Sequence, residues 1–341
     1  MKPQRVNHEM LDEVLRGLKT PSKSISSKYF YDARGCELFQ QITELEEYYL
    51  TRSEREILQW IGEPLQDHLG QENIDLIEIG PGDGSKGKLI VSQLLGGASQ
   101  LNYFGVDICD RALDELKQHF SSLPRKVDPR LILGDYLNFS NLPLSKNERR
   151  KLICFFGSSI GNLTHEESAK FIREVSQSLS EGDFFLIGFD LKKDRNLMTR
   201  AYNDSKGVTR EFNLNLLTRF NRELGATFDV SSFEHLEYFD ESCGAMVSYL
   251  VSKKDQDVVI GGEVIRFCAN ERIHTESSFK YSHEDIQKLI DGSGLSIAES
   301  FFDSKKYFSC VLFQKNSRSL WSWVQGLKRR YTSEDGWEHY G

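Results

Sequence analysis

A set of closely spaced glycines follows the first strongly apolar run of the chain. The run is Ile74–Ile79, and Gly80, Gly82 and Gly84 come after it at alternate positions. Such glycines tolerate positive φ angles and let the backbone approach a ligand closely. Lys86 lies at the start of the amphipathic segment that comes next. The pattern predicts a strand, a tight turn and a helix that together bind a nucleotide-like ligand.

The spacing of these glycines separates two kinds of nucleotide. Dinucleotide-binding folds use Gly-x-Gly-x-x-Gly to set a pyrophosphate on a helix N-terminus. Here the glycines alternate, and an acid, Asp83, lies inside the loop. Its carboxylate would repel a pyrophosphate but suits a ligand with a cationic amino-acid end, such as S-adenosylmethionine. An ordinary glycine turn is the alternative, and the residues that follow favour the nucleotide.

Acidic residues close the next two predicted strands. Asp107 ends Leu101–Val106, and Asp135 comes just after Arg130–Leu133. Nucleotide-binding sheets place the carboxylate that binds the ribose hydroxyls at the end of the second strand. A carboxylate after the third strand can accept the adenine amino group. Either acid alone would be an ordinary solvated loop residue, but two at successive strand ends favour a shared ligand.

A polar loop, Gly157–Asn162, follows the fourth predicted strand, Lys151–Phe156. Ligands of open α/β sheets bind beyond the carboxyl ends of the strands near the switch point, so this loop is expected to face the reactive end of the cofactor. Asn162 is its candidate polar residue. It also precedes the predicted helix His165–Leu179, so the start of a turn is the alternative interpretation.

Strands and helices alternate as far as Phe184–Phe189, which predicts a doubly wound parallel α/β sheet. After Leu191 a helical stretch, Glu211–Leu224, precedes several strand-like runs, and these predict an inserted α+β lobe over the substrate. Ser296–Phe302 and Tyr307–Gln314 predict a closing strand pair. The expected divisions are an N-terminal helical and aromatic cap (1–60), a cofactor-binding domain (61–192 with 282–316), an inserted substrate-binding lobe (193–281) and a C-terminal tail (317–341).

Composition narrows the class of partner. The 341 residues carry a formal net charge of −8, which argues against a nucleic-acid backbone as the main partner and favours a small-molecule substrate. No apolar run approaches membrane-spanning length, and the N-terminus, MKPQRVNHEM, lacks the apolar core of a signal peptide. We therefore expect a cytoplasmic protein with no membrane contact, either a monomer or a weak dimer.

Several phrases resemble those of the histidine-specific, S-adenosylmethionine-dependent methyltransferase family, from about Ser24 to Gln314. They are FYDARG, LFQQITELEEYYLTR, EIGPGDGSK, GSSIGN, AYND and the TES segment near Glu276. The resemblance implies a class I methyltransferase fold, Rossmann-like and doubly wound, with S-adenosylmethionine as cofactor. It also implies trimethylation of the α-amino group of L-histidine to hercynine, a step of ergothioneine biosynthesis.

The resemblance assigns residues as well. Those implied to hold the cofactor are Gly80, Gly82, Lys86, Asp107, Asp135 and Tyr136. Those implied to be catalytic, by positioning the α-amino and carboxylate groups of the substrate, are Tyr31, Asn162 and Tyr202. Those implied to contact the rest of the substrate are Phe39, Tyr48, Gly161, Ser248, Glu276 and Ser278.

The residues around Glu276 also suit an imidazole on chemical grounds. If Arg272–Lys280 is extended, alternation places His274, Glu276 and Ser278 on one face. A carboxylate and a hydroxyl suit the two imidazole nitrogens, one of which donates while the other accepts. A metal site of His274, Glu276 and His283 is the rival explanation, but no third ligand has a convincing spacing, and we expect no metal.

One position departs from the family. A methionine is expected against the substrate side chain where this chain has Ser248, and the smaller residue would enlarge the pocket or reorient the ring. Histidine stays favoured because Glu276 and Ser278 are present. The alternatives are the same chemistry on a tryptophan-like or other amine, and a non-catalytic S-adenosylmethionine-binding protein. Retention of Asp107 and Asn162 argues against the last of these.

Overall fold

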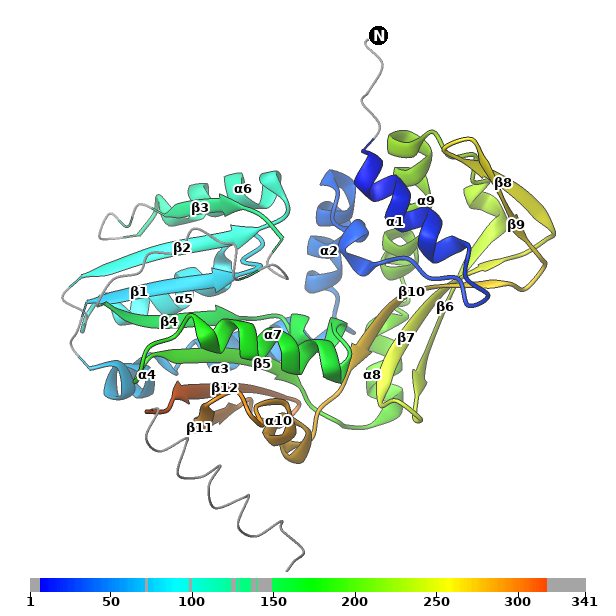
Figure 1. Ribbon diagram of the computed structural model, residues 1–341. Helices are drawn as coiled ribbons and strands as arrows, with labels where there is room; N and C mark the ends of the chain where they lie inside the picture. The colour runs from blue at the N-terminus through cyan, green and yellow to red at the C-terminus, as the bar shows by residue number, and fades with distance from the viewer. Residues whose placement is uncertain are drawn as a thin grey trace, which may run out of the picture.

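The computed structural model describes residues 7–70, 73–97, 100–123, 127, 129–135, 139 and 149–317. A seven-stranded sheet forms the first of two lobes (Figure 1), with the strand order β11-β12-β5-β4-β1-β2-β3. Its strands are β1 (Ile74–Ile79), β2 (Leu101–Asp107), β3 (Arg130–Leu133), β4 (Arg150–Phe155), β5 (Phe184–Asp190), β11 (Leu295–Phe302) and β12 (Phe308–Lys315).

The sheet is doubly wound, as predicted. Strands β5, β4, β1, β2 and β3 run parallel, whereas β12 pairs antiparallel with both β5 and β11. This arrangement confirms the parallel core and the closing strand pair expected of a class I methyltransferase. The strand order reverses between β1 and β4. Ligands of such sheets bind outside the carboxyl ends of the strands at this switch point.

Helices cover both faces of this sheet, which explains why β1 and β5 are buried along their whole length. Leu76 of β1 packs into the core beneath the first set of helices, and its neighbour Ile77 packs into the core on the opposite face. The helices of the first face are α3 (Tyr49–Leu58), α4 (Gly62–Leu69), α5 (Ser85–Leu94) and α6 (Asp110–Phe120), and those of the second are α7 (His165–Gln177) and α10 (His283–Leu289).

The second lobe is built on a three-stranded antiparallel sheet of order β10-β7-β6 (Figure 1). Its elements are α8 (Arg195–Tyr202), α9 (Val208–Leu224), β6 (Phe233–Asp240), β7 (Ala245–Ser252), the hairpin β8 (Gln256–Ile260) and β9 (Glu263–Phe267), and β10 (Arg272–Phe279). This lobe has the helical and strand composition predicted for the insertion.

The N-terminal segment packs against the second lobe. It comprises α1 (His8–Leu18), a 3₁₀ turn (Ser27–Phe30) and α2 (Ala33–Glu44). The Phe30 ring stacks on Phe212 of α9 with a centroid separation of 4.6 Å. Asp32, which caps α2, also accepts a hydrogen bond of 2.8 Å from Asn215. In contrast, α3 packs against β12 and α5 of the first lobe, so the division expected at residue 60 stays a prediction.

Some predictions fall on residues that the structure leaves undescribed. Tyr136 and the tryptophan-containing tail beyond Ser317 lie outside the described residues. Within the described ranges, no helix combines the length and the apolar character that crossing a bilayer would require.

Candidate active site

A cavity with about 540 Å³ of empty space, part of it open to solvent, is lined by residues of both lobes. Contributions come from α2, α8, α9, β10 and the loop after β4. Seven residues assigned from the sequence line it, namely Tyr31, Phe39, Tyr48, Asn162, Tyr202, Glu276 and Ser278. The cavity therefore brings together side chains that are as much as 247 positions apart in the chain, between Tyr31 and Ser278.

The loop after β4 forms one wall of the cavity. Gly157 has φ 77° and Ser158 has φ 55°, and a 3₁₀ turn, Ser159–Asn162, follows them. The Gly157 N–H donates to both carboxylate oxygens of Glu54, at 2.7 and 2.9 Å. Glu54 is fully buried, and this contact ties the loop to helix α3.

Glu54 also forms an ion pair with Lys86, which was assigned to the cofactor from the sequence. The Lys86 ammonium lies 2.6 Å from a carboxylate oxygen of Glu54. Its charge is thus offset by a buried acid, and the pair links the start of α5 to the loop after β4. Glu54 was not identified from the sequence, where it is only a glutamate at the start of a predicted helix.

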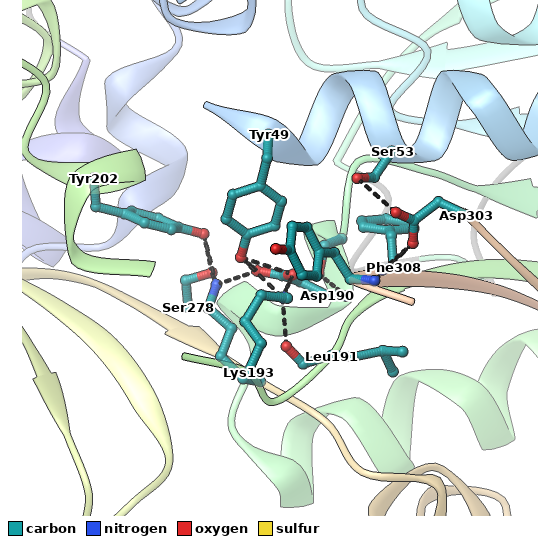
Figure 2. A network of polar contacts seen from close by, with 12 residues as sticks. Tyr49, Ser53, Asp190, Leu191, Lys193, Tyr202, Ser278, Asp303 and Phe308 are labelled. Atoms are coloured by element: carbon teal, nitrogen blue, oxygen red, sulfur yellow. Dashed lines mark hydrogen bonds and ion pairs between the residues drawn. The ribbon is translucent and has the colours of Figure 1, made fainter. Parts of the chain in front are cut away.

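Lys280 joins two cavity residues, Tyr202 and Ser278, which Figure 2 labels beside Asp190, in a buried polar network. Its ammonium donates to the Tyr202 hydroxyl at 2.7 Å and to the Ser278 hydroxyl at 2.8 Å, and those two hydroxyls are 2.7 Å apart. It also lies 2.9 Å from a carboxylate oxygen of Asp190, and both side chains are fully buried. Lys280 therefore fixes Tyr202 and Ser278 relative to each other.

Asp190, at the end of β5, anchors the other side of this network (Figure 2). Its carboxylate accepts a hydrogen bond of 2.8 Å from Tyr49 and pairs with Lys193. Burial lowers the pKa of Lys193 to about 8, with Asp190 opposing the shift. The Asp190 N–H donates to Ser158 at 2.9 Å, which connects the network to the cavity loop. Asp190, which directly follows the predicted strand Phe184–Phe189, was not among the residues assigned from the sequence.

Glu276, on β10, also lines the cavity. Burial and, next, the charge of Glu237 raise its pKa to about 8, whereas Lys280 and a hydrogen bond from Asn162 oppose the shift. Burial also raises the pKa of the Tyr48 and Tyr202 phenols well above the usual range, so both are neutral hydrogen-bonding groups near neutral pH. Glu237, on β6, was not identified from the sequence.

Two residues assigned to the substrate are not among those that line the cavity. Ser248 pairs with Glu276 across the sheet, and its hydroxyl donates to the carboxylate of Glu237. Gly161 packs the loop after β4 against β10, because a Cβ there would lie 2.9 Å from the carbonyl oxygen of Phe279. Their assignment as substrate contacts stays a prediction.

The prediction that His274 shares a face with Glu276 and Ser278 is wrong. A β-bulge between His274 and Glu276 shifts the register of β10 against β7. His274 therefore lies opposite Tyr249, whereas Glu276 lies opposite the neighbouring residue, Ser248. The Nε2 of His274 lies 2.9 Å from the hydroxyl of Ser277, on the opposite face. Among the residues that the structure describes, no three or more His, Cys, Asp or Glu side chains form a group that could hold a metal ion.

The glycine loop lies at the carboxyl end of β1. Gly80, Gly82 and Gly84 all have positive φ, at 62°, 55° and 72°. Asp107, at the end of β2, accepts hydrogen bonds from the N–H groups of Gly82 at 3.1 Å and Cys109 at 2.9 Å, and burial raises its pKa. A Cβ on Gly82 would meet no atom within 4 Å, so open space adjoins the loop.

The second predicted cofactor carboxylate, Asp135, follows β3 at the same edge of the sheet. The Gly134 N–H donates to the carbonyl oxygen of Asp107 at 2.9 Å, which places Asp135 just beyond paired strand ends. A left-handed glycine turn with open space beside Gly82 and a buried carboxylate next to it fit an adenosyl ligand. The role of each individual residue toward that ligand stays a prediction.

Comparison with known proteins finds relatives over nearly the whole chain. The family described as "Histidine-specific methyltransferase, SAM-dependent" matches residues 10–315. The "Histidine N-alpha-methyltransferase" of Mycolicibacterium smegmatis is 32% identical over 285 residues, which cover 83% of this chain and 88% of that protein. The protein of the same name from Mycobacterium tuberculosis is 32% identical over 306 residues, with coverages of 89% and 94%. "Ergothioneine biosynthesis protein 1" of Neurospora crassa is 30% identical over 330 residues, which cover 94% of this chain and 36% of that protein.

Proposed function

Because this chain belongs to the histidine-specific, S-adenosylmethionine-dependent methyltransferase family, we propose that it methylates the α-amino group of L-histidine, with trimethylated hercynine as the final product. One observation carries the proposal: Asn162, Tyr202, Glu276 and Ser278 line a single cavity. They provide polar groups for both ends of an amino acid. The name of the fungal relative supports ergothioneine biosynthesis as the pathway.

The cofactor is expected between the glycine loop and the ends of β2 and β3. Gly80 and Gly82 would allow close backbone approach, Asp107 would accept from the ribose hydroxyls, and Asp135 would lie near the adenine. S-adenosylmethionine supplies the electrophilic methyl group when it is bound there. The loop after β4, which Glu54 holds in place, contributes Gly157, Ser158 and Ser159 to the cavity wall on the same side of the sheet.

The substrate is expected to lie with its backbone groups near Asn162 and Tyr202 and its ring near Glu276 and Ser278. Lys280 keeps the hydroxyls of Tyr202 and Ser278 in place without lining the cavity itself. Such preorganisation lowers the entropic cost of holding an amine at attacking distance, which is expected to be the main source of acceleration.

The attacking amine must be neutral, and its ordinary pKa is near ~8. Proton release to water or to a neighbouring group is therefore sufficient, and no strong base is required. Tyr31 and Phe39 line the cavity with ring centroids 5.7 Å apart. Their faces can stabilise the positive charge that persists on nitrogen as methyl groups accumulate.

Mass spectrometry tests this proposal. Purified protein is incubated with S-adenosylmethionine and L-histidine, and parallel reactions contain tryptophan, tyrosine or histamine. We expect histidine alone to gain three methyl groups. Methylation of another amine while histidine stays unmodified would keep the enzyme class but overturn the substrate. A complete absence of methyl transfer to every amine would favour a non-catalytic protein.

A further inference from the structure

A row of polar side chains runs from the cavity across the second lobe. Glu276 on β10 pairs with Ser248 on β7, and Ser248 pairs with Glu237 on β6. Residues directly opposite one another on adjacent strands project to the same face, with Cβ atoms about 5 Å apart. Glu276 lines the cavity, so Glu237 lies behind it, two strands further from the ligand.

Glu237 is buried, but its hydrogen bonds are incomplete. Its side chain is 1% exposed, and Oε1 has no hydrogen-bond partner within the described part of the chain. Oε2 accepts from the Ser248 hydroxyl and lies 3.2 Å from Nε2 of His235, which is 2% exposed. A buried carboxylate without full pairing is costly, so its presence calls for a compensating charge or proton.

The charged groups around Glu276 supply only part of that compensation. Lys280, directly after β10, opposes the rise in the pKa of Glu276, but Lys280 and Lys193 share a single carboxylate, Asp190 of β5. The phenols of Tyr48 and Tyr202, which also line the cavity, are neutral near neutral pH. On β6, His235 can offset at most one of the two carboxylates, Glu237 and Glu276. With His235 uncharged, the two ammonium groups of Lys193 and Lys280 face three carboxylates, Asp190, Glu237 and Glu276, so there is room for one further positive charge.

We propose that the part of the cavity around Glu276 selects a ligand whose side chain is cationic. Glu237 is the positioning residue that imposes this preference through Ser248 and Glu276. The inference rests on the proposed function, under which the cation is the imidazolium form of histidine. Before the substrate binds, Glu276 retains a proton near neutral pH, because burial and the charge of Glu237 raise its pKa to about 8. On binding, that proton moves to the ring, and both imidazole N–H groups then donate.

Ser248 fits this arrangement better than a large apolar residue would. Its hydroxyl donates to Glu237, which holds that carboxylate toward Glu276 instead of toward solvent. A side chain without a donor at this position would leave His235 as the only partner of the Glu237 carboxylate within the described part of the chain, because Oε1 has none there. The serine that departs from the family pattern thus acts together with Glu237 as one unit.

The first test is ¹⁵N NMR of ring-labelled L-histidine bound to the protein together with S-adenosylhomocysteine, recorded from pH 6 to 9. We expect the bound ring to stay imidazolium up to about pH 8, well above its ordinary pKa of ~6.5. In Glu237→Gln, the pKa of the bound ring should fall by about one unit. A neutral ring in the wild-type complex at pH 7 would overturn the proposal.

The second test is a panel of dissociation constants, measured by calorimetry with S-adenosylhomocysteine present, for histidine, arginine, phenylalanine and tryptophan. A charge two strand spacings away, about 10 Å, changes a binding constant on the order of tenfold. Glu237→Gln should therefore reduce the preference for basic over neutral side chains by about that factor. An unchanged preference in the variant, or a wild-type preference for neutral side chains, would overturn the inference.

The panel separates this inference from the proposed function. If histidine is not methylated but basic side chains still bind better and lose that advantage in Glu237→Gln, the inference stands and the substrate assignment fails. Glu234→Gln is the matched control, because Glu234 lies on the same strand but is exposed, and it should change nothing. Ser248→Ala should shift the ring pKa in the same direction as Glu237→Gln, and thermal unfolding verifies that each variant is folded.

Discussion

Replacing Lys280 with methionine removes the cation that joins Asp190, Tyr202 and Ser278 while keeping most of the side-chain volume. Breaking a buried ion pair costs about 3–5 kcal/mol, because the remaining charge is left without compensation. Asp190 keeps Tyr49 and Lys193 as partners, so we expect the lower end of that range, about 3 kcal/mol. The Michaelis constant for histidine should rise as well, because Tyr202 and Ser278 lose their shared donor.

Lys192→Met is the matched control. The Lys192 ammonium lies 2.8 Å from Asp285, with the two side chains 50% and 20% exposed, so losing this pair should cost less than about 1 kcal/mol. Urea unfolding followed by circular dichroism gives both free energies of unfolding, and steady-state kinetics gives the Michaelis constants. The network does not have the role described if Lys280→Met destabilises the protein no more than Lys192→Met does and leaves the Michaelis constant for histidine unchanged.

Three further predictions concern the two ligand regions. The pKa of Glu276 is raised in the folded state, so its stabilising contribution is present below its ordinary value near 4.5 and is lost as pH rises toward 8. Glu276→Gln should therefore raise the melting temperature of the ligand-free protein at pH 9 but not at pH 4, while abolishing histidine binding; equal melting temperatures at pH 9 would contradict this. Asp107→Asn should weaken S-adenosylmethionine binding by about 10- to 100-fold in calorimetry, since a charged acceptor contributes about 1.5–3 kcal/mol, and unaltered affinity would remove Asp107 from the cofactor site. Glu54→Gln leaves Lys86 unpaired beside the loop after β4 and should lower the free energy of unfolding by about 3 kcal/mol in urea titration; a loss below about 1 kcal/mol would show that the pair is not structurally important.

The sequence predicted the sheet well because its signals are local. Continuous apolar runs such as Ile74–Ile79 and Phe184–Phe189 predict parallel strands buried on both faces, and both lie in the centre of the sheet. Seven of the assigned site residues line one cavity. They could be assigned from the sequence because a family phrase marks each of them individually. Each such phrase is short enough to be identified without knowing what it packs against.

The remaining features depend on contacts between distant segments, which periodicity cannot reveal. Glu54 meets Gly157 across 103 positions, and Lys280 meets Tyr202 across 78. A buried charge and an exposed one also look alike in a sequence, which is why Glu237 was missed. Alternation failed at His274 because a single extra residue in a strand reverses every side chain beyond it.

A crystal structure of the protein with S-adenosylhomocysteine and L-histidine tests the central claim most directly. The account predicts the imidazole between Glu276 and Ser278, and the α-amino group near Asn162 and Tyr202, facing the sulfur of the cofactor. Histidine bound in the reverse orientation, or outside this cavity, would contradict the assignment of both ends of the site.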